Sequence, residues 1–471
     1  MDKIEVYLEI VPLPVLIGVV FLSGLVLVAI PGRLRLGFGL ILMPVWLTLG
    51  RLPDLGPVQA LSKTTGFALF AFVAFAAAVD PHPKRRLPPI LWLYPVITFA
   101  TPLWAVASEE KALTFILNLQ WFMLCLAGVL VARTTATREG LRRVFKCLTI
   151  GTAIALLVLF AAIVKSPGSI FRAGLGRFEP WGALSVHVGP VFIFGVPLLT
   201  YYGMRGAPVV FRPFALACAG MGALMALLTA SRSAVFPLAF LMAVLGWAFR
   251  KSPITMVAGA VAIIAALYIG SGLVSEANLN RLNSLQTGRY EIWSEYVGAI
   301  ASSPILGRLT AEPAPLPGDT HAHNAYIEVL YQFGFVVGIP LFTLAAWSLI
   351  SAFRVYLRRQ SLGLEQTEAT LLCAMMPAIY LHGMATLAIY YPTYSWAFIQ
   401  VFVASTFISL ASSMHQPFLE DAEGPWEDDW EDGDAAPSAD EYAEDGYADD
   451  PDDTWDDGHE DDHEYGEHRP A

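Results

Sequence analysis

Long apolar runs separated by short polar segments dominate the first 415 residues of the chain. The runs are roughly 16 to 22 residues long, close to the ~20 apolar residues that a helix needs to cross a bilayer. They predict an all-α polytopic membrane protein with about 12 or 13 transmembrane helices. The runs centre near residues 20, 42, 71, 98, 122, 154, 194, 221, 241, 263, 338, 381 and 403.

Basic residues gather in every second loop between these runs. Because short basic loops stay on the cytoplasmic side of a membrane, this alternation predicts the orientation of the chain. It places residues 165–185, the Ser231-Arg232-Ser233 break and the connection 274–324 outside. Thirteen spans would put the N-terminus outside and twelve would put it inside, and the sequence leaves both open. The basic loops are Lys84-Arg85-Arg86, the Arg133–Lys146 segment, Arg205 with Arg212, Arg250-Lys251, and Arg354 with Arg358-Arg359.

Residues 416–471 differ in character from the membrane domain, residues 1–415. They mix Asp, Glu, Gly, Ala, Trp and Tyr without apolar periodicity, which predicts a disordered acidic tail on the cytoplasmic side. Residues 420–471 alone hold 24 of the 41 acidic residues. The formal net charge of −12 therefore comes from the tail, because residues 1–419 carry 28 basic and 17 acidic residues.

Composition excludes a water-soluble globule. Hydrophobic residues make up 55% of the chain, charged residues only 15%, and the mean hydropathy is +0.54. We expect membrane lipids as surroundings and no nucleic-acid partner. The four cysteines lie far apart without CxxC spacing, and the HxH pattern of His321 and His323 is a weak metal motif, so no metal site and no cofactor are predicted.

The longest connection outside the membrane, residues 274–324, has a composition unlike that of a linker. From Arg289 onward apolar residues recur at helical spacing up to Ser303-Pro304, which predicts an amphipathic helix along the membrane interface. Arg289 at its start could pair bidentately with phosphate oxygens, or it could only snorkel to the interface. The apolar positions are Ile292, Trp293, Tyr296, Val297 and Ile300.

The end of this connection carries two histidines and an asparagine. A helix capped by Asp319 or Thr320 would seat His321, His323 and Asn324 in its first turn. A histidine at a helix N-terminus tends to stay neutral and able to accept a proton, while the free amides nearby attract anions. This pattern favours a base beside a phosphate site. The alternative is that the histidines only hydrogen-bond loop backbone.

Arg232 separates two apolar runs, 214–230 and 234–249, with only serines beside it. An arginine at such depth is a functional candidate, although it could also act as a clamp on helix-end carbonyls. Arg172 and Arg177 add cations on the same side. Their gathering outside runs against the positive-inside bias, and a diphosphate ligand would account for it.

These segments resemble the O-antigen ligase and O-antigen polymerase family. Its signature combines a GR-x-x-x-W segment, a P-x-x-G turn and an HN pair at the end of a large periplasmic loop. Two positions differ from the family pattern, with Arg308-Leu309 after Gly307 in place of x-G and Trp181 where asparagine is common. The matching residues are Gly288-Arg289 with Trp293, Pro304 with Gly307, His323-Asn324, the Ser231-Arg232-Ser233 triplet and Arg172.

The resemblance implies a helical membrane glycosyltransferase that takes a glycan from undecaprenyl diphosphate without a nucleotide sugar or a metal. Its site would face the periplasm from the bacterial inner membrane. The acceptor would be lipid A core for a ligase or a growing polysaccharide for a polymerase, and the sequence leaves this open. The expected residues are His323 as catalytic base, Arg232, Arg289 and Arg172 at the diphosphate, and His321, Asn324 and Arg177 in support.

Two other functions are compatible with parts of the sequence. A lipid-linked oligosaccharide flippase or transporter would suit the many helices and outer cations, but should show midplane charges and often an internal repeat, and neither is evident. A membrane scaffold that displays its acidic tail would account for residues 416–471 and for nothing in the outer connection.

Overall fold

The computed structural model describes residues 13–107, 111–165, 167, 178–250, 289–308, 322–386 and 396–413. All of them belong to the first of two compact units, Met1–Asp421. Every regular element among the described residues is a helix, so the all-α prediction is confirmed. The predicted acidic tail lies outside the described residues.

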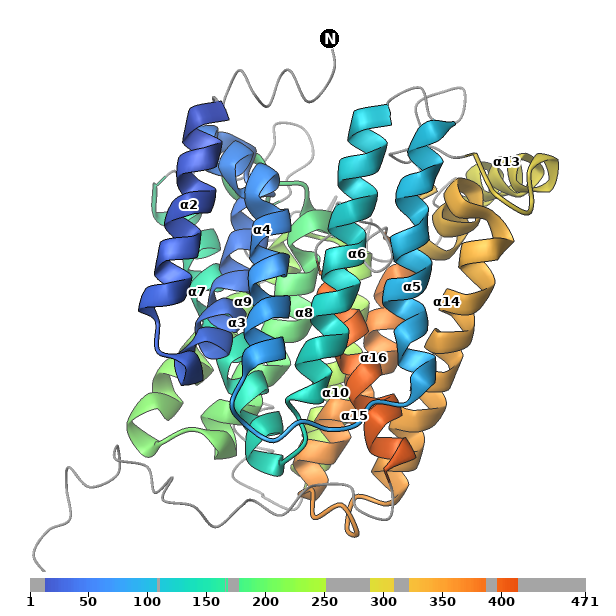
Figure 1. The fold of residues 1–471 in the computed structure, drawn as a ribbon. Helices are drawn as coiled ribbons and strands as arrows, with labels where there is room; N and C mark the ends of the chain where they lie inside the picture. The colour runs from blue at the N-terminus through green and yellow to red at the C-terminus, as the bar shows by residue number, and fades with distance from the viewer. Residues whose placement is uncertain are drawn as a thin grey trace, which may run out of the picture. The chain divides into compact units, whose positions relative to one another are not determined.

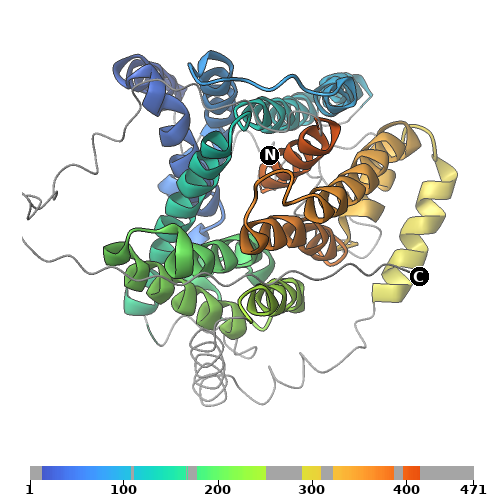
Figure 2. The same cartoon turned by 90° about the horizontal axis from the view of Figure 1, so that it is seen from below.

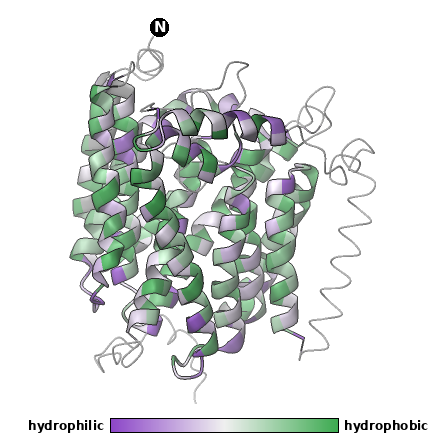
Figure 3. Ribbon diagram, turned by 90° about the vertical axis from the view of Figure 1, so that its right-hand side faces the viewer, coloured by the Kyte–Doolittle hydropathy of each residue, from purple (hydrophilic) through white to green (hydrophobic). Residues whose placement is uncertain are grey.

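Most helices run side by side in alternating directions (Figure 1). The exception is α13 (Arg289–Ser302), which lies across the end of the bundle beside α14 (Figures 2 and 3). The 3-10 turns Pro89–Trp92 and Thr101–Val106 extend α5 at both ends. The bundle helices are α2 (Leu13–Ala29), α3 (Gly32–Leu49), α4 (Pro57–Val79), α5 (Leu93–Ala100), α6 (Lys111–Arg133), α7 (Arg138–Lys165), α8 (Ser185–Tyr201), α9 (Arg212–Leu228), α10 (Arg232–Ala248), α14 (Ala325–Leu357), α15 (Gln366–Gly383) and α16 (Ala397–Ser412).

Eight stretches of helix among the described residues are long and apolar enough to cross a membrane. Helices α10 and α16 are apolar but shorter, with 17 and 16 residues. The prediction of a polytopic membrane protein is therefore confirmed, while the apolar run near residue 263 lies outside the described residues. The eight stretches are Gly32–Leu49, Pro57–Val79, Pro89–Val106, Thr114–Arg133, Arg138–Lys165, Ser185–Arg205, Val209–Leu228 and Ala325–Leu357.

Apolar residues dominate the helices of the bundle between its two ends (Figure 3). Large apolar side chains such as Phe75, Phe99 and Phe353 are more than half exposed. Water-soluble proteins rarely expose so many large apolar side chains. Inside the bundle, the rings of Phe70 and Phe402 both stack on Phe398. The apolar flank is therefore the surface that lipid chains would cover.

The loops that carry the basic clusters lie together at one end of the bundle, which we call the basic end (Figure 1). They join α4 to α5, α6 to α7, α8 to α9 and α14 to α15. Helix α13 lies at the opposite end, which we call the α13 end, and α2 begins there (Figure 1). If the basic end faces the cytoplasm, α2 begins on the outer side, as the alternative of thirteen spans requires.

Polar contacts tie the loops of the basic end to one another. Arg143 and His82 both pair with the buried carboxylate of Asp80, at 2.9 and 2.6 Å. The Arg85 backbone donates to the Arg133 carbonyl at 2.8 Å, and burial lowers the pKa of the Arg85 guanidinium to about 10. Part of the basic cluster therefore holds the fold together as well as marking orientation.

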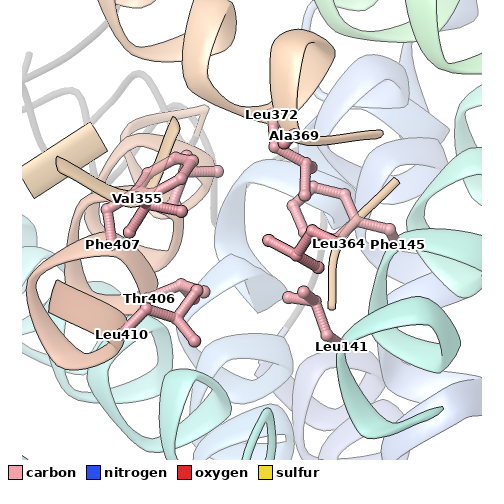
Figure 4. A pocket seen from close by; sticks show the side chains of 10 residues that line it. Leu141, Phe145, Val355, Leu364, Ala369, Leu372, Thr406, Phe407 and Leu410 are labelled. Atoms are coloured by element: carbon pink, nitrogen blue, oxygen red, sulfur yellow. The ribbon is translucent and has the colours of Figure 1, made fainter. Parts of the chain in front are cut away.

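Beneath these loops the bundle is closed by apolar side chains. A cavity of about 10 Å³ remains between α7, α14, α15 and α16, large enough for one water at most (Figure 4). Leu141, Phe145, Val355 and Phe407 line it. The bundle is therefore closely packed around this cavity.

Helix α14 is broken near the α13 end, and the SPILG turn, residues 303–307, fills the break. Gly334 has φ +64° and ψ −167°, so Phe335 cannot donate to Tyr331 within the helix. The Phe335 amide donates instead to the Pro304 carbonyl at 2.8 Å, while the Tyr331 carbonyl accepts from Arg308 at 2.8 Å. The P-x-x-G turn thus replaces the hydrogen bonds that α14 loses.

Two glycines make this close approach of backbones possible. A Cβ on Gly334 would lie 2.2 Å from the Ile305 carbonyl oxygen. A Cβ on Gly307, at φ +69°, would lie 2.5 Å from the Gln332 carbonyl oxygen. Both positions combine a left-handed backbone with no space for a side chain.

We expect Gly334→Ala to lower the thermal unfolding temperature of the detergent-purified protein. The alanine would be strained in its backbone and would push the SPILG turn away, at a cost of about 1–3 kcal/mol. Gly298→Ala in α13 is the matched control, because nothing lies within 4 Å of its Cβ and alanine favours a helix. Equal unfolding temperatures for the two variants would contradict this account of the break.

The two ends also predict the accessibility of single cysteines. Ser294 in α13 and Ser361 in the α14–α15 loop are both exposed. We expect a membrane-impermeant maleimide to label Ser294→Cys in intact cells, and Ser361→Cys only after permeabilisation. The unsubstituted protein, whose four cysteines are buried or half-buried, sets the background. Labelling of Ser361→Cys alone in intact cells would reverse the orientation.

Candidate functional site

Asn324 caps the N-terminus of α14. Its side-chain oxygen accepts hydrogen bonds from the backbone amides of Tyr326 and Ile327, at 3.0 and 3.3 Å. The helix therefore begins at Ala325, and the prediction that His323 and Asn324 lie in the first turn of a helix capped further upstream is wrong. The reason is that the asparagine side chain satisfies the free amides itself. His321 lies outside the described residues.

His323 directly precedes this cap in an unusual backbone conformation. Its φ of +49° is left-handed, which is uncommon for any residue other than glycine. The neighbouring residue Ala322 is held from both sides. Its amide donates to the Glu328 carboxylate at 3.0 Å, and its carbonyl accepts from the Trp293 indole at 2.8 Å. These two bonds fix the strained segment in place, and His323 itself stays half-buried.

Helix α13 supplies one side of this clamp. It runs from Arg289 to Ser302, which confirms the helix predicted from the apolar spacing. Tyr296 is fully buried, with its ring 4.8 Å from that of Tyr331. Burial, with the Glu328 carboxylate nearby, raises the pKa of the Tyr296 hydroxyl. Val297, which was expected on the apolar face, is 58% exposed.

Arg289 and Arg232 are both the first residues of helices. Arg289 opens α13 and is half-buried. Arg232, also half-buried, opens α10, whose N-cap Ser231 lies 2.9 Å from the Ser233 hydroxyl, oxygen to oxygen. Side chains at these positions stand near free backbone amides, where anions are favoured.

Arg172 and Arg177 lie outside the described residues. The chain is described again from Phe178, whose amide donates to the Leu228 carbonyl at the end of α9, at 2.9 Å. Nearby, the Trp181 indole donates to the Val158 carbonyl at 2.9 Å. The tryptophan that departs from the family pattern therefore has a structural role at the α7–α8 junction.

Three helices begin at the α13 end after a left-handed residue. The non-glycine residues with positive φ among the described residues are Trp181, Ala230 and His323, and they precede α8, α10 and α14 respectively. Helices α8 and α14 both pack close to the α10–α15 pair. Strained connections of this kind tend to gather at functional sites.

Additional charged and ionisable groups surround this region. Arg51, Lys63 and His323 all lie within electrostatic range of His187, near the start of α8. The sequence analysis did not select Arg51, Lys63 or His187. Lys63 and His187 could have been found as ionisable residues within apolar helices, which are functional candidates by default.

The sequence analysis also did not select His382. It is 3% exposed near the end of α15, and its Nδ1 lies 2.7 Å from the Ser233 carbonyl oxygen. Gly189 of α8 packs against this contact, since a Cβ there would lie 3.4 Å from the His382 ring. His382 thus connects the Ser231-Arg232-Ser233 triplet to α15.

The α13 end therefore combines arginines at helix starts, imidazoles and three helix N-termini. Such an arrangement suits an anionic ligand together with a group that accepts a proton. Within the described parts of the chain, no three His, Cys, Asp or Glu side chains gather as they would around a metal ion. The chemistry available from these residues is phosphate binding and acid–base catalysis.

Comparison with known families gives a match that covers part of the chain. Residues 216–342 match the family model Wzy_C, described as O-Antigen ligase. The match runs from α9 through the first half of α14 and includes Arg232, Arg289, His323 and Asn324. No curated protein matches the chain. Residues 216–342 thus resemble the O-antigen ligase domain, which confirms the resemblance of this membrane protein to the O-antigen ligase and polymerase family.

Proposed function

We propose that the protein transfers a glycan from undecaprenyl diphosphate to a sugar hydroxyl, at the α13 end, facing the periplasm from the inner membrane. The observation that carries this proposal is the O-antigen ligase match over a segment that contains Arg232, Arg289 and a clamped His323. The family match supports the class of activity. The donor, the acceptor and the face of the membrane belong to the proposal.

In the proposed reaction, His323 removes the proton from the acceptor hydroxyl as its oxygen attacks the anomeric carbon of the donor. The bond between that carbon and the diphosphate oxygen breaks, and undecaprenyl diphosphate leaves. Direct in-line attack inverts the anomeric centre. The proton stays on His323 until it passes to solvent, so no metal or nucleotide sugar enters the step.

The leaving diphosphate gains negative charge as this bond breaks. Arg232 and Arg289 are assigned to neutralise it, with Arg172 as a third cation, because a guanidinium pairs bidentately with phosphate oxygens. Asn324 supports the base by capping α14, and Arg177 and His321 are supporting residues by their position in the sequence. Arg51 and Lys63 add positive potential around His187, within reach of the same region.

Genetic deletion would identify the acceptor. Accumulation of full-length lipid-linked polymer without ligation would identify a ligase, and single repeats on lipid A core would identify a polymerase. A flippase is the competing function. It predicts that lipid-linked glycan stays on the cytoplasmic side after deletion, and that the purified protein performs no transfer in detergent.

We expect Arg232→Lys and Arg289→Lys each to retain little activity, because lysine keeps the charge but loses the bidentate fork. The measurement is glycan transfer by purified protein from a defined undecaprenyl-diphosphate donor, with donor affinity measured in parallel. Arg308→Lys is the matched control, since Arg308 is exposed at the same end and its guanidinium donates to the Ser302 hydroxyl at 3.1 Å. Full turnover by both site variants would remove the diphosphate role.

We expect His323→Ala to fold and bind donor but to lower turnover by roughly 100-fold or more, the usual effect of losing a general base. His321→Ala should have a smaller effect. Thermal unfolding checks that the variant is folded, and donor binding separates affinity from chemistry. A defect wholly in donor affinity would reassign His323 to phosphate binding.

A further inference from the structure

The carbonyl of Ser233 lacks its normal partner within α10. In an α-helix this oxygen would accept from the amide four residues later, but that residue is Pro237, which has no N–H. A carbonyl left unpaired at this depth would be costly. His382 of α15 supplies the missing donor, with Nδ1 at 2.7 Å from the oxygen.

This contact defines the state of the imidazole. A carbonyl oxygen can only accept, so Nδ1 of His382 carries a proton. The ring is almost fully buried, and its Nε2 has no hydrogen-bond partner among the described residues. Within the described parts of the chain the ring therefore makes one hydrogen bond, and that bond joins α15 to the residue directly after Arg232.

The same end of α15 is also joined to the start of α14. The Tyr326 hydroxyl donates to the Tyr380 carbonyl at 3.1 Å. Tyr380 stands two residues before His382, and Tyr326 three residues after His323. The Tyr380 hydroxyl is in turn 2.8 Å from the Ser348 hydroxyl of α14, which fixes the tyrosine to the same helix at a deeper level.

We propose that the last turn of α15 is a positioning element that holds Arg232 and His323 at their working separation. His382 anchors the first turn of α10, and the Tyr326–Tyr380 bond anchors the first turn of α14. This inference rests on the proposed function, in which Arg232 binds the donor diphosphate and His323 accepts the proton. Neither His382 nor Tyr380 needs to touch the substrate.

Loss of the two anchors should affect different quantities, donor affinity for one and turnover for the other. Loss of the His382 anchor should weaken donor binding, because it acts through Arg232. Loss of the Tyr326 anchor should lower turnover with little effect on donor affinity, because it acts through His323. A defect in folding alone would not divide the two effects in this way.

His382→Asn and His382→Gln form a matched pair. The asparagine amide nitrogen can take the place of Nδ1 and still donate to the Ser233 carbonyl, whereas the glutamine amide is one bond further out. We expect His382→Gln to raise the dissociation constant for undecaprenyl diphosphate about tenfold, the scale of one lost buried hydrogen bond, and His382→Asn to stay near the unsubstituted protein. Tyr326→Phe should lower kcat about fivefold and leave that dissociation constant unchanged.

Pro237→Ala tests whether His382 positions α10 or only provides a hydrogen-bond donor for the Ser233 carbonyl. Alanine restores a helical N–H to Ser233 but provides no link to α15. In the double variant His382→Gln with Pro237→Ala, the unfolding temperature should recover while donor affinity stays low. Recovery of both, or equal donor affinity for the Asn and Gln variants, would overturn the inference.

Arg232→Lys provides the reference for the proposed function itself. If it binds undecaprenyl diphosphate normally, the assignment of Arg232 fails and the positioning role falls with it. If it weakens donor binding while His382→Gln does not, only the positioning role is overturned.

Discussion

Inside a bilayer every backbone amide and carbonyl must find a partner within the protein, because lipid chains offer none. In this structure α10 and α14 each lose backbone hydrogen bonds near the α13 end, and groups from elsewhere in the chain replace them. At Gly334 the repair comes from the SPILG turn, through Pro304 and Arg308. At Pro237 it comes from His382. The breaks therefore join segments that lie far apart in the sequence.

These repairs change how the sequence motifs are understood. The P-x-x-G turn is a structural plug whose glycine allows backbone to pack on backbone, and Trp293 of the GR-x-x-x-W segment clamps Ala322 through its indole. Both the turn and Trp293 can therefore be essential for the structure without contacting a substrate. Among the signature residues, Arg232, Arg289 and His323 are the ones to which we assign the proposed chemistry.

Backbone strain is found at the same end of the bundle. Left-handed residues precede α8, α10 and α14, and each such residue costs of order 1–3 kcal/mol unless its surroundings compensate. Around His323 the compensation is visible in the two bonds on Ala322 and in the Asn324 cap. The result is a histidine held between hydrogen-bonded neighbours on both sides, as the base role that we propose for it would require.

The sequence alone determined the all-α membrane class, the helix from Arg289 to Ser302 and the resemblance carried by residues such as Arg232 and His323-Asn324. These features depend on local spacing and on residue chemistry, both of which follow directly from the order of residues along the chain. Only the tertiary structure decided that α14 begins at Ala325, that Trp293 and Glu328 hold the His323 segment, and that His382 pairs with Ser233. Those contacts join residues up to 149 positions apart, and no local pattern shows which carbonyl lacks a partner or which distant side chain will reach it.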